Sequence, residues 1–130
     1  VVQQGFHLTE RSHDGPPYRW LGPAPVARVY LPKVRLPLEV RLFLVAVYRG
    51  IDIAAIRVAL NDGPRATVAL DSVDGAVFLR CRPASGPGGD GLLHHIDIDC
   101  GATFSPADEG GADSRRLGIA LSRIELDSLD

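Results

Sequence analysis

The clearest pattern in this chain is an alternation of apolar and polar residues, which is strongest at residues 36–48. Every even-numbered residue from 36 to 44 is leucine or valine, whereas Glu39 and Arg41 stand at odd positions. Because side chains alternate between the two faces of a strand, this pattern predicts a strand with one buried face. From Phe43 to Val47 both faces are apolar, so we expect this end to be covered on both sides.

Shorter apolar runs, separated by turn-forming residues, predict the other strands. They lie at residues 26–31, 65–70, 77–82, 92–99 and 117–126. Asn61-Asp62-Gly63 and Asp74-Gly75 are expected to be tight turns, because these residue types tolerate a positive φ. Between residues 51 and 60 the apolar positions change parity at Ala54-Ala55, which indicates a bulge or a corner.

The spacing of these runs predicts the fold class. No stretch has the periodicity of a long amphipathic helix, and strands recur roughly every 8–12 residues with turn signals between them. We therefore expect an all-β, antiparallel, jelly-roll-like β-sandwich of about eight strands, with at most one helical turn. The length of 130 residues suits a single domain that spans the whole sequence.

Charge and composition narrow the function classes. The net charge is -2, so the chain lacks the excess of basic residues that a general nucleic-acid or anionic-membrane binder needs. No apolar run reaches the length of about 18 residues that a transmembrane helix requires. The sequence contains no methionine, and we expect a fragment of a longer protein. Cys81 and Cys100 lie in or beside apolar runs, which favours buried free thiols over a disulfide.

Histidines and acidic residues form two motifs that could bind a metal. His7-x-x-Glu10 would place both side chains on one face only in a helix, and none is predicted there. In the strand at residues 92–99, His95, Asp97 and Asp99 share one face, and such ligands suit a divalent cation. The alternative is a solvated strand face, with His94 among the apolar residues of the opposite face. We expect no metal and no other cofactor.

Four charged residues near the two ends of the chain are expected to form ion pairs. Glu10 and Arg19 lie near the start, and Asp113 and Arg115 lie near the end. The first and last strands of a sandwich are often neighbours, so we expect at least one buried ion pair that joins them. Removing one partner of a buried pair costs about 3–5 kcal/mol, because the other charge is left without compensation.

Two longer motifs carry a family resemblance. The first is Gly5-Phe6-His7-x-x-Glu10, followed after eight residues by Arg19-Trp20. The second is Asp113-x-Arg115-x-Leu117-Gly118-Ile119-Ala120-x-x-x-Ile124-x-Leu126. In this order, with Asn61-Asp62-Gly63 between them, the motifs resemble a small β-sandwich domain attached to bacterial glycosyltransferases and other cell-surface polysaccharide biosynthesis proteins. The resemblance covers residues 4–127.

The resemblance implies a non-catalytic accessory domain, similar in architecture to jelly-roll carbohydrate-binding modules. The enzymatic activity would lie in a transferase domain outside this sequence, and the location would be cytoplasmic, where cysteines stay reduced. The expected partner is a bacterial surface glycan or the transferase domain of the parent protein.

Polar, glycine-rich loops are the expected ligand-binding elements, because loops on a rigid β-scaffold commonly carry function. They lie at residues 13–17, 83–91 and 105–113. The candidate ligand-binding residues are Tyr18, Trp20, Asp108, Glu109 and Asp113. Two alternatives remain open: a structural or oligomerisation module, and a small metal-dependent β-sandwich enzyme. The enzyme would use His7, His94, His95, Glu10 or Asp97.

Overall fold

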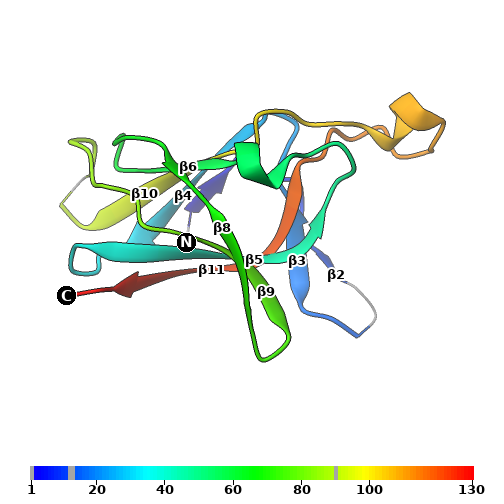
Figure 1. The fold of residues 1–130 in the computed structure, drawn as a ribbon. Helices are drawn as coiled ribbons and strands as arrows, with labels where there is room; N and C mark the ends of the chain where they lie inside the picture. Colours follow the sequence, from blue (N-terminus) through cyan, green and yellow to red (C-terminus); the bar gives the residue numbers. More distant parts are fainter. Residues whose placement is uncertain (1, 12–13, 90) are drawn as a thin grey trace.

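Two antiparallel sheets face each other in the computed structural model, which describes residues 2–11, 14–89 and 91–130 (Figure 1). The first sheet runs, in spatial order, β1 (Val2–Gln4), β4 (Val26–Pro32), β10 (Leu93–Asp99), β6 (Arg57–Leu60) and β7 (Ala66–Thr67). The second runs β2 (Glu10–Arg11), β3 (Pro17–Trp20), β11 (Ile119–Ser128), β5 (Leu38–Val47), β9 (Ala76–Cys81) and β8 (Ala69–Val73). Most consecutive strands lie in different sheets, as in a jelly roll.

The predicted all-β sandwich is confirmed, with more strands than the expected eight. The described residues form eleven strands, and the additional ones include β1 and β2, which have only two or three residues. Such short strands are too brief to show alternation in the sequence. The single strand expected at residues 65–70 is divided between β7 and β8, which belong to different sheets. The described part of the chain also contains two single-turn 3-10 helices, η1 (Ile53–Ala55) and η2 (Pro106–Glu109), one more than expected. No described helix has the length and apolar character needed to cross a membrane.

The core lies between the sheets and follows the predicted alternation from Leu38 onwards, whereas Leu36 precedes β5 and is exposed. Leu38, Val40 and Leu42 of β5 are completely or almost completely buried, and Val29 of β4 and Ile96 of β10 are completely buried. Burying one such side chain contributes about 1.5–3 kcal/mol relative to leaving it in water. This inter-sheet core provides the rigid scaffold on which the candidate site is built.

Residues 43–47 were expected to be covered on both sides, and this is only partly true on the outer face of the second sheet. Phe43 is buried, because it packs against Phe78 and the Arg123 guanidinium lies 3.7 Å from its ring centroid. Val45 is 43% exposed, so this part of the face has no cover. The Arg123 side chain thus covers the Phe43 ring on this outer face, which is not covered by another sheet.

The tight turns lie where the sequence predicts them. Asn61 and Asp62 have φ values of 51° and 61°, and the Gly63 amide donates to the Leu60 carbonyl, as a type I′ turn requires. Asp74 and Gly75 also have positive φ, and they close the β8–β9 hairpin. The corner expected at Ala54-Ala55 is the helix η1.

Both cysteines are buried free thiols. Cys81 ends β9 and Cys100 follows β10, and both side chains belong to the apolar core. Burial raises the pKa of each thiol to about 12, because the thiolate loses its hydration in an apolar environment. These thiols therefore act as core side chains rather than as nucleophiles.

Candidate functional site

The two ends of the chain meet where β3 pairs with β11, which brings the two sequence motifs side by side. Nη1 of Arg115 donates to Oε2 of Glu10 at 2.8 Å, and Nη2 donates to Oδ2 of Asp113 at 2.7 Å. An ion pair does join the two ends of the chain, through Arg115 and Glu10. We expected a buried pair, but these three side chains are each about one third exposed. Solvent screening therefore makes these ion pairs weaker than buried pairs.

Arg19 does not join this group. In β3 it lies opposite Leu121, a core residue of β11, so its side chain belongs to the inner face of the second sheet. There Nη1 donates to Oε1 of Gln3 in β1 at 2.6 Å, a bond between the two sheets. The Arg19 Nε is enclosed by protein and has no acceptor, and no described carboxylate pairs with this guanidinium.

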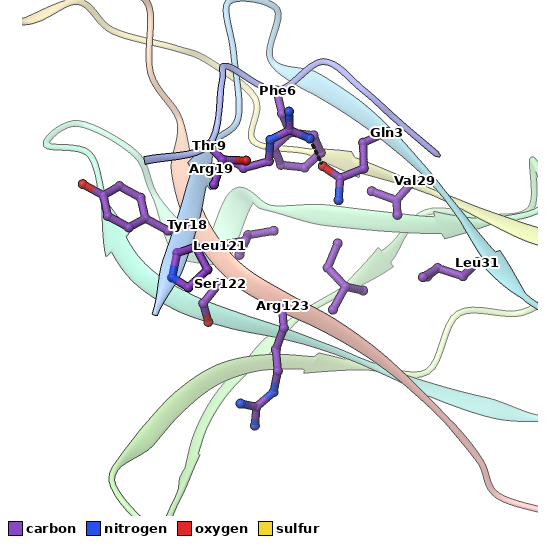
Figure 2. A pocket seen from close by; sticks show the side chains of 12 residues that line it. Gln3, Phe6, Thr9, Tyr18, Arg19, Val29, Leu31, Leu121, Ser122 and Arg123 are labelled. Atoms are coloured by element: carbon purple, nitrogen blue, oxygen red, sulfur yellow. Dashed lines mark hydrogen bonds between the residues drawn. The ribbon is translucent and has the colours of Figure 1, made fainter. Parts of the chain in front are cut away.

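Beside Arg19 the sandwich opens into a cleft of about 350 Å³, which we call the inter-sheet cleft (Figure 2). It lies between β1 and β4 of the first sheet and β3 and β11 of the second. The described lining combines apolar side chains with amide, hydroxyl and guanidinium groups. The lining residues are Gln3, Phe6, Thr9, Pro17, Tyr18, Arg19, Val29, Leu31, Leu121, Ser122, Arg123 and Ile124.

Of the predicted ligand-binding residues, only Tyr18 lines the cleft. Figure 2 shows its ring directed away from Arg19 and Gln3, so it stands at the rim. Trp20 does not line the cleft, and it packs edge-to-face on Tyr48 with 6.3 Å between ring centroids. The sequence indicates that Tyr18 and Trp20 lie on one face of the strand and Arg19 on the other. Only the pairing of β3 with β11 shows that the Arg19 face is the inner one.

The acidic ligand candidates lie elsewhere. Asp108 pairs with Arg116 at 3.6 Å, Glu109 pairs with Arg49 at 3.8 Å, and Asp113 belongs to the Arg115 group. Figure 1 places η2 and residues 83–89 at opposite ends of the sandwich, so these two loops do not form a common site. The third predicted loop begins at His13, which lies outside the described residues.

The metal candidates of β10 form an ion-pair network instead. The arrangement brings together Asp62, His95 and Asp97, with ligand atoms within 4.8 Å of one another. Arg28 occupies this cluster: it donates to both oxygens of Asp97 and, at 3.1 Å, to Asp62. A guanidinium therefore already balances the acidic charge that would attract a cation.

The other residues of the proposed metal set have structural partners of their own. Asp99 pairs with Arg65 at 2.6 Å rather than joining the cluster. His94 is buried between the Val34 carbonyl and the Asn61 side chain. His7 hydrogen-bonds to the Arg116 carbonyl, and Glu10 accepts from the neighbouring Arg115, so each of these four groups already has a structural partner.

Sequence reasoning missed both Asp62 and the cleft residues Gln3 and Thr9. Asp62 reaches His95 because the type I′ turn folds it back over β10, at 3.0 Å from Nε2. Gln3 belongs to a three-residue strand without a detectable pattern. Comparisons of the chain with protein-family models, with curated proteins and with solved structures each returned no match.

Proposed function

We propose that this chain is a non-catalytic accessory domain that binds carbohydrate in the inter-sheet cleft. The observation that carries the proposal is the cleft itself, which has about 350 Å³ of space, apolar walls and a few polar groups. Small-molecule sites share this composition and have volumes from about 300 Å³ upwards. A cleft of this size suits a short saccharide.

The chemistry of the lining supports a sugar rather than a purely apolar ligand. Val29, Leu31 and Leu121 offer apolar surface for the C–H faces of a sugar ring. Thr9 and Ser122 carry hydroxyl groups that both donate and accept hydrogen bonds, as sugar hydroxyls require. Tyr18 at the rim adds an aromatic ring with a polar end.

The same lining favours binding over catalysis. The described residues of the cleft include no carboxylate, imidazole or thiol, and the Tyr18 phenol is the one common general acid or base among them. The alternative of a small metal-dependent enzyme depends on His7, Glu10, His94, His95 and Asp97. His95 and Asp97 share the network of Arg28 and Asp62. The other three side chains bond to groups outside that network, so the five do not converge on one open site.

The parent protein and its location complete the proposal. By its motifs the chain resembles a domain of bacterial glycosyltransferases and polysaccharide biosynthesis proteins, so we place it beside a transferase domain in the cytoplasm. In this arrangement the cleft holds part of the glycan that the transferase domain extends.

The experiment is an amide NMR titration of the protein with neutral and acidic bacterial oligosaccharides. We expect shifts at residues 18–20 and 121–124, and loss of these shifts in Ser122→Phe, which adds a ring to the cleft lining. Ser72→Phe, the same substitution on the exposed strand β8, is the matched control and should bind normally. The absence of any shift at these residues with the whole panel would contradict the proposal.

A structural or oligomerisation module is the second candidate, and the edge strand β8 favours it. All five of its residues are exposed, including Leu70 and Val73. Exposed strand edges can pair with another chain. A monomeric mass in light scattering at high protein concentration would remove self-association from consideration.

A further inference from the structure

Arg19 has no carboxylate partner among the described residues, in contrast to Arg28 and Arg115. Arg28 uses Nε and Nη2 to hold both oxygens of Asp97, at 2.7 and 2.9 Å. Arg115 uses the same two nitrogens to hold Asp113. This two-nitrogen edge of a guanidinium matches the two oxygens of a carboxylate.

In Arg19 this edge is unused. Its only described hydrogen bond runs from Nη1 to the neutral amide oxygen of Gln3. Nε is enclosed by protein without an acceptor, so a ligand would reach the guanidinium through its Nη nitrogens. A guanidinium has five N–H donors, so one bond to an amide leaves most of them unpaired. A partly enclosed cation without a counter-charge is the kind of group that an anionic ligand would satisfy.

The rest of the cleft leaves this charge uncompensated. No aspartate or glutamate is among its described lining residues. Arg123 also lines the cleft, but its Nε donates to Glu125 at 2.7 Å and its guanidinium lies over Phe43. Figure 2 shows the Arg123 guanidinium directed away from Arg19 and Gln3. Arg19 is thus the free positive charge of the described lining.

We infer that the ligand of the inter-sheet cleft is an acidic saccharide, whose carboxylate binds the Arg19 guanidinium while the sugar ring lies on the apolar walls. This inference rests on the proposed function and specifies its substrate class as uronic acid-type sugars. It also gives Gln3 a role, because its bond from β1 holds the guanidinium at the cleft in the absence of ligand.

The test compares three probes in amide NMR titrations: a short oligoglucuronate, a neutral oligoglucoside of equal length, and acetate. We expect the oligoglucuronate to shift residues 18–20 and 121–123 and to bind about tenfold or more tightly than the neutral sugar, as a charge-assisted pair implies. Acetate should bind more weakly than the oligoglucuronate, because it lacks the sugar ring.

Three variants locate the charge. Arg19→Gln should lose the preference for the acidic sugar, and Arg19→Lys should keep part of it, because lysine retains the charge without the two-nitrogen edge. Arg11→Gln removes an exposed arginine of the neighbouring strand β2 and should keep the full preference. The dispersion of each amide spectrum reports whether the variant is folded.

The outcomes separate the inference from the proposed function. Equal binding of acidic and neutral sugars, or an unchanged preference in Arg19→Gln, would overturn the acidic class and leave carbohydrate binding intact. If acetate bound as tightly as the oligoglucuronate, the sugar ring would contribute nothing, and the assignment of a saccharide as the ligand would be wrong. If no probe moves the amides at residues 18–20 and 121–123, both the inference and the proposed function are wrong.

Discussion

Arg115 lies between carboxylates from the two ends of the chain, and its contribution to stability should depend on pH. Hydrogen bonds from Arg115 lower the pKa of Asp113 to about 2. A carboxyl with a lowered pKa stabilises the fold above its unfolded pKa of about 3.9, and this contribution is lost as the pH falls towards 2. Exposure of the pair keeps the effect modest.

We therefore predict that Arg115→Ala lowers the melting temperature by a few degrees at pH 7 and that the difference shrinks as the pH is lowered from 5 to 2. The control is Arg49→Ala, because Arg49 is 83% exposed and lies 3.8 Å from Glu109. This variant should melt like the parent protein throughout. A difference for Arg115→Ala that persists unchanged at pH 2 would contradict the assignment of Asp113.

At the scale of elements, the turn after β6 does more than reverse the chain. Asn61 is buried at this turn, where its Oδ1 accepts from the His95 amide and its Nδ2 bonds to His94 and Ser85. The side chain thus joins the turn to β10 and to the loop at residues 83–91. Asp74 has a similar positive φ in the β8–β9 turn, but it is exposed and has no described side-chain partner.

The two turns provide a matched pair of substitutions. We predict that Asn61→Ala destabilises the protein by about 3–4 kcal/mol, because it leaves buried polar groups of β10 unpaired and strains a positive φ. Asp74→Ala should cost about 1 kcal/mol, since it adds only the strain. Chemical denaturation measures both values. Similar costs for the two variants would show that Asn61 acts through its backbone alone.

The same elements show what could be predicted from the sequence. The alternation in β5 and the Asn-Asp and Asp-Gly turns depend on local chemistry, so their positions were predictable. The inner position of Arg19 depends on its pairing with Leu121, about 100 residues away in the chain. The contact of Asp62 with His95 likewise depends on how a turn folds over another strand. Sites built from such long-range register are not visible in local patterns.

At the scale of the whole molecule, the inter-sheet cleft lies at the edge of the first sheet that is formed by the three-residue strand β1. β1 pairs with β4 through Val2↔Tyr30, Gln3↔Val29 and Gln4↔Arg28, and its two glutamines are exposed. The Gln3–Arg19 bond is a link across the cleft between the two sheets. β1 therefore acts as a wall of the cleft more than as part of the scaffold.

Removal of residues 1–4 tests this division of roles. We predict a folded protein with a melting temperature lowered by a few degrees, because a short edge strand is lost. Amides of β4 that face β1 should exchange faster, and saccharide binding should weaken as the cleft loses one wall and Arg19 loses its positioning bond. Gln3→Ala is the control that keeps the strand and removes only that bond, so it should retain slow exchange in β4. A sandwich whose stability resides in its inter-sheet core should not depend on an edge strand of three residues. Global unfolding of the truncated chain would therefore show that β1 is part of the scaffold.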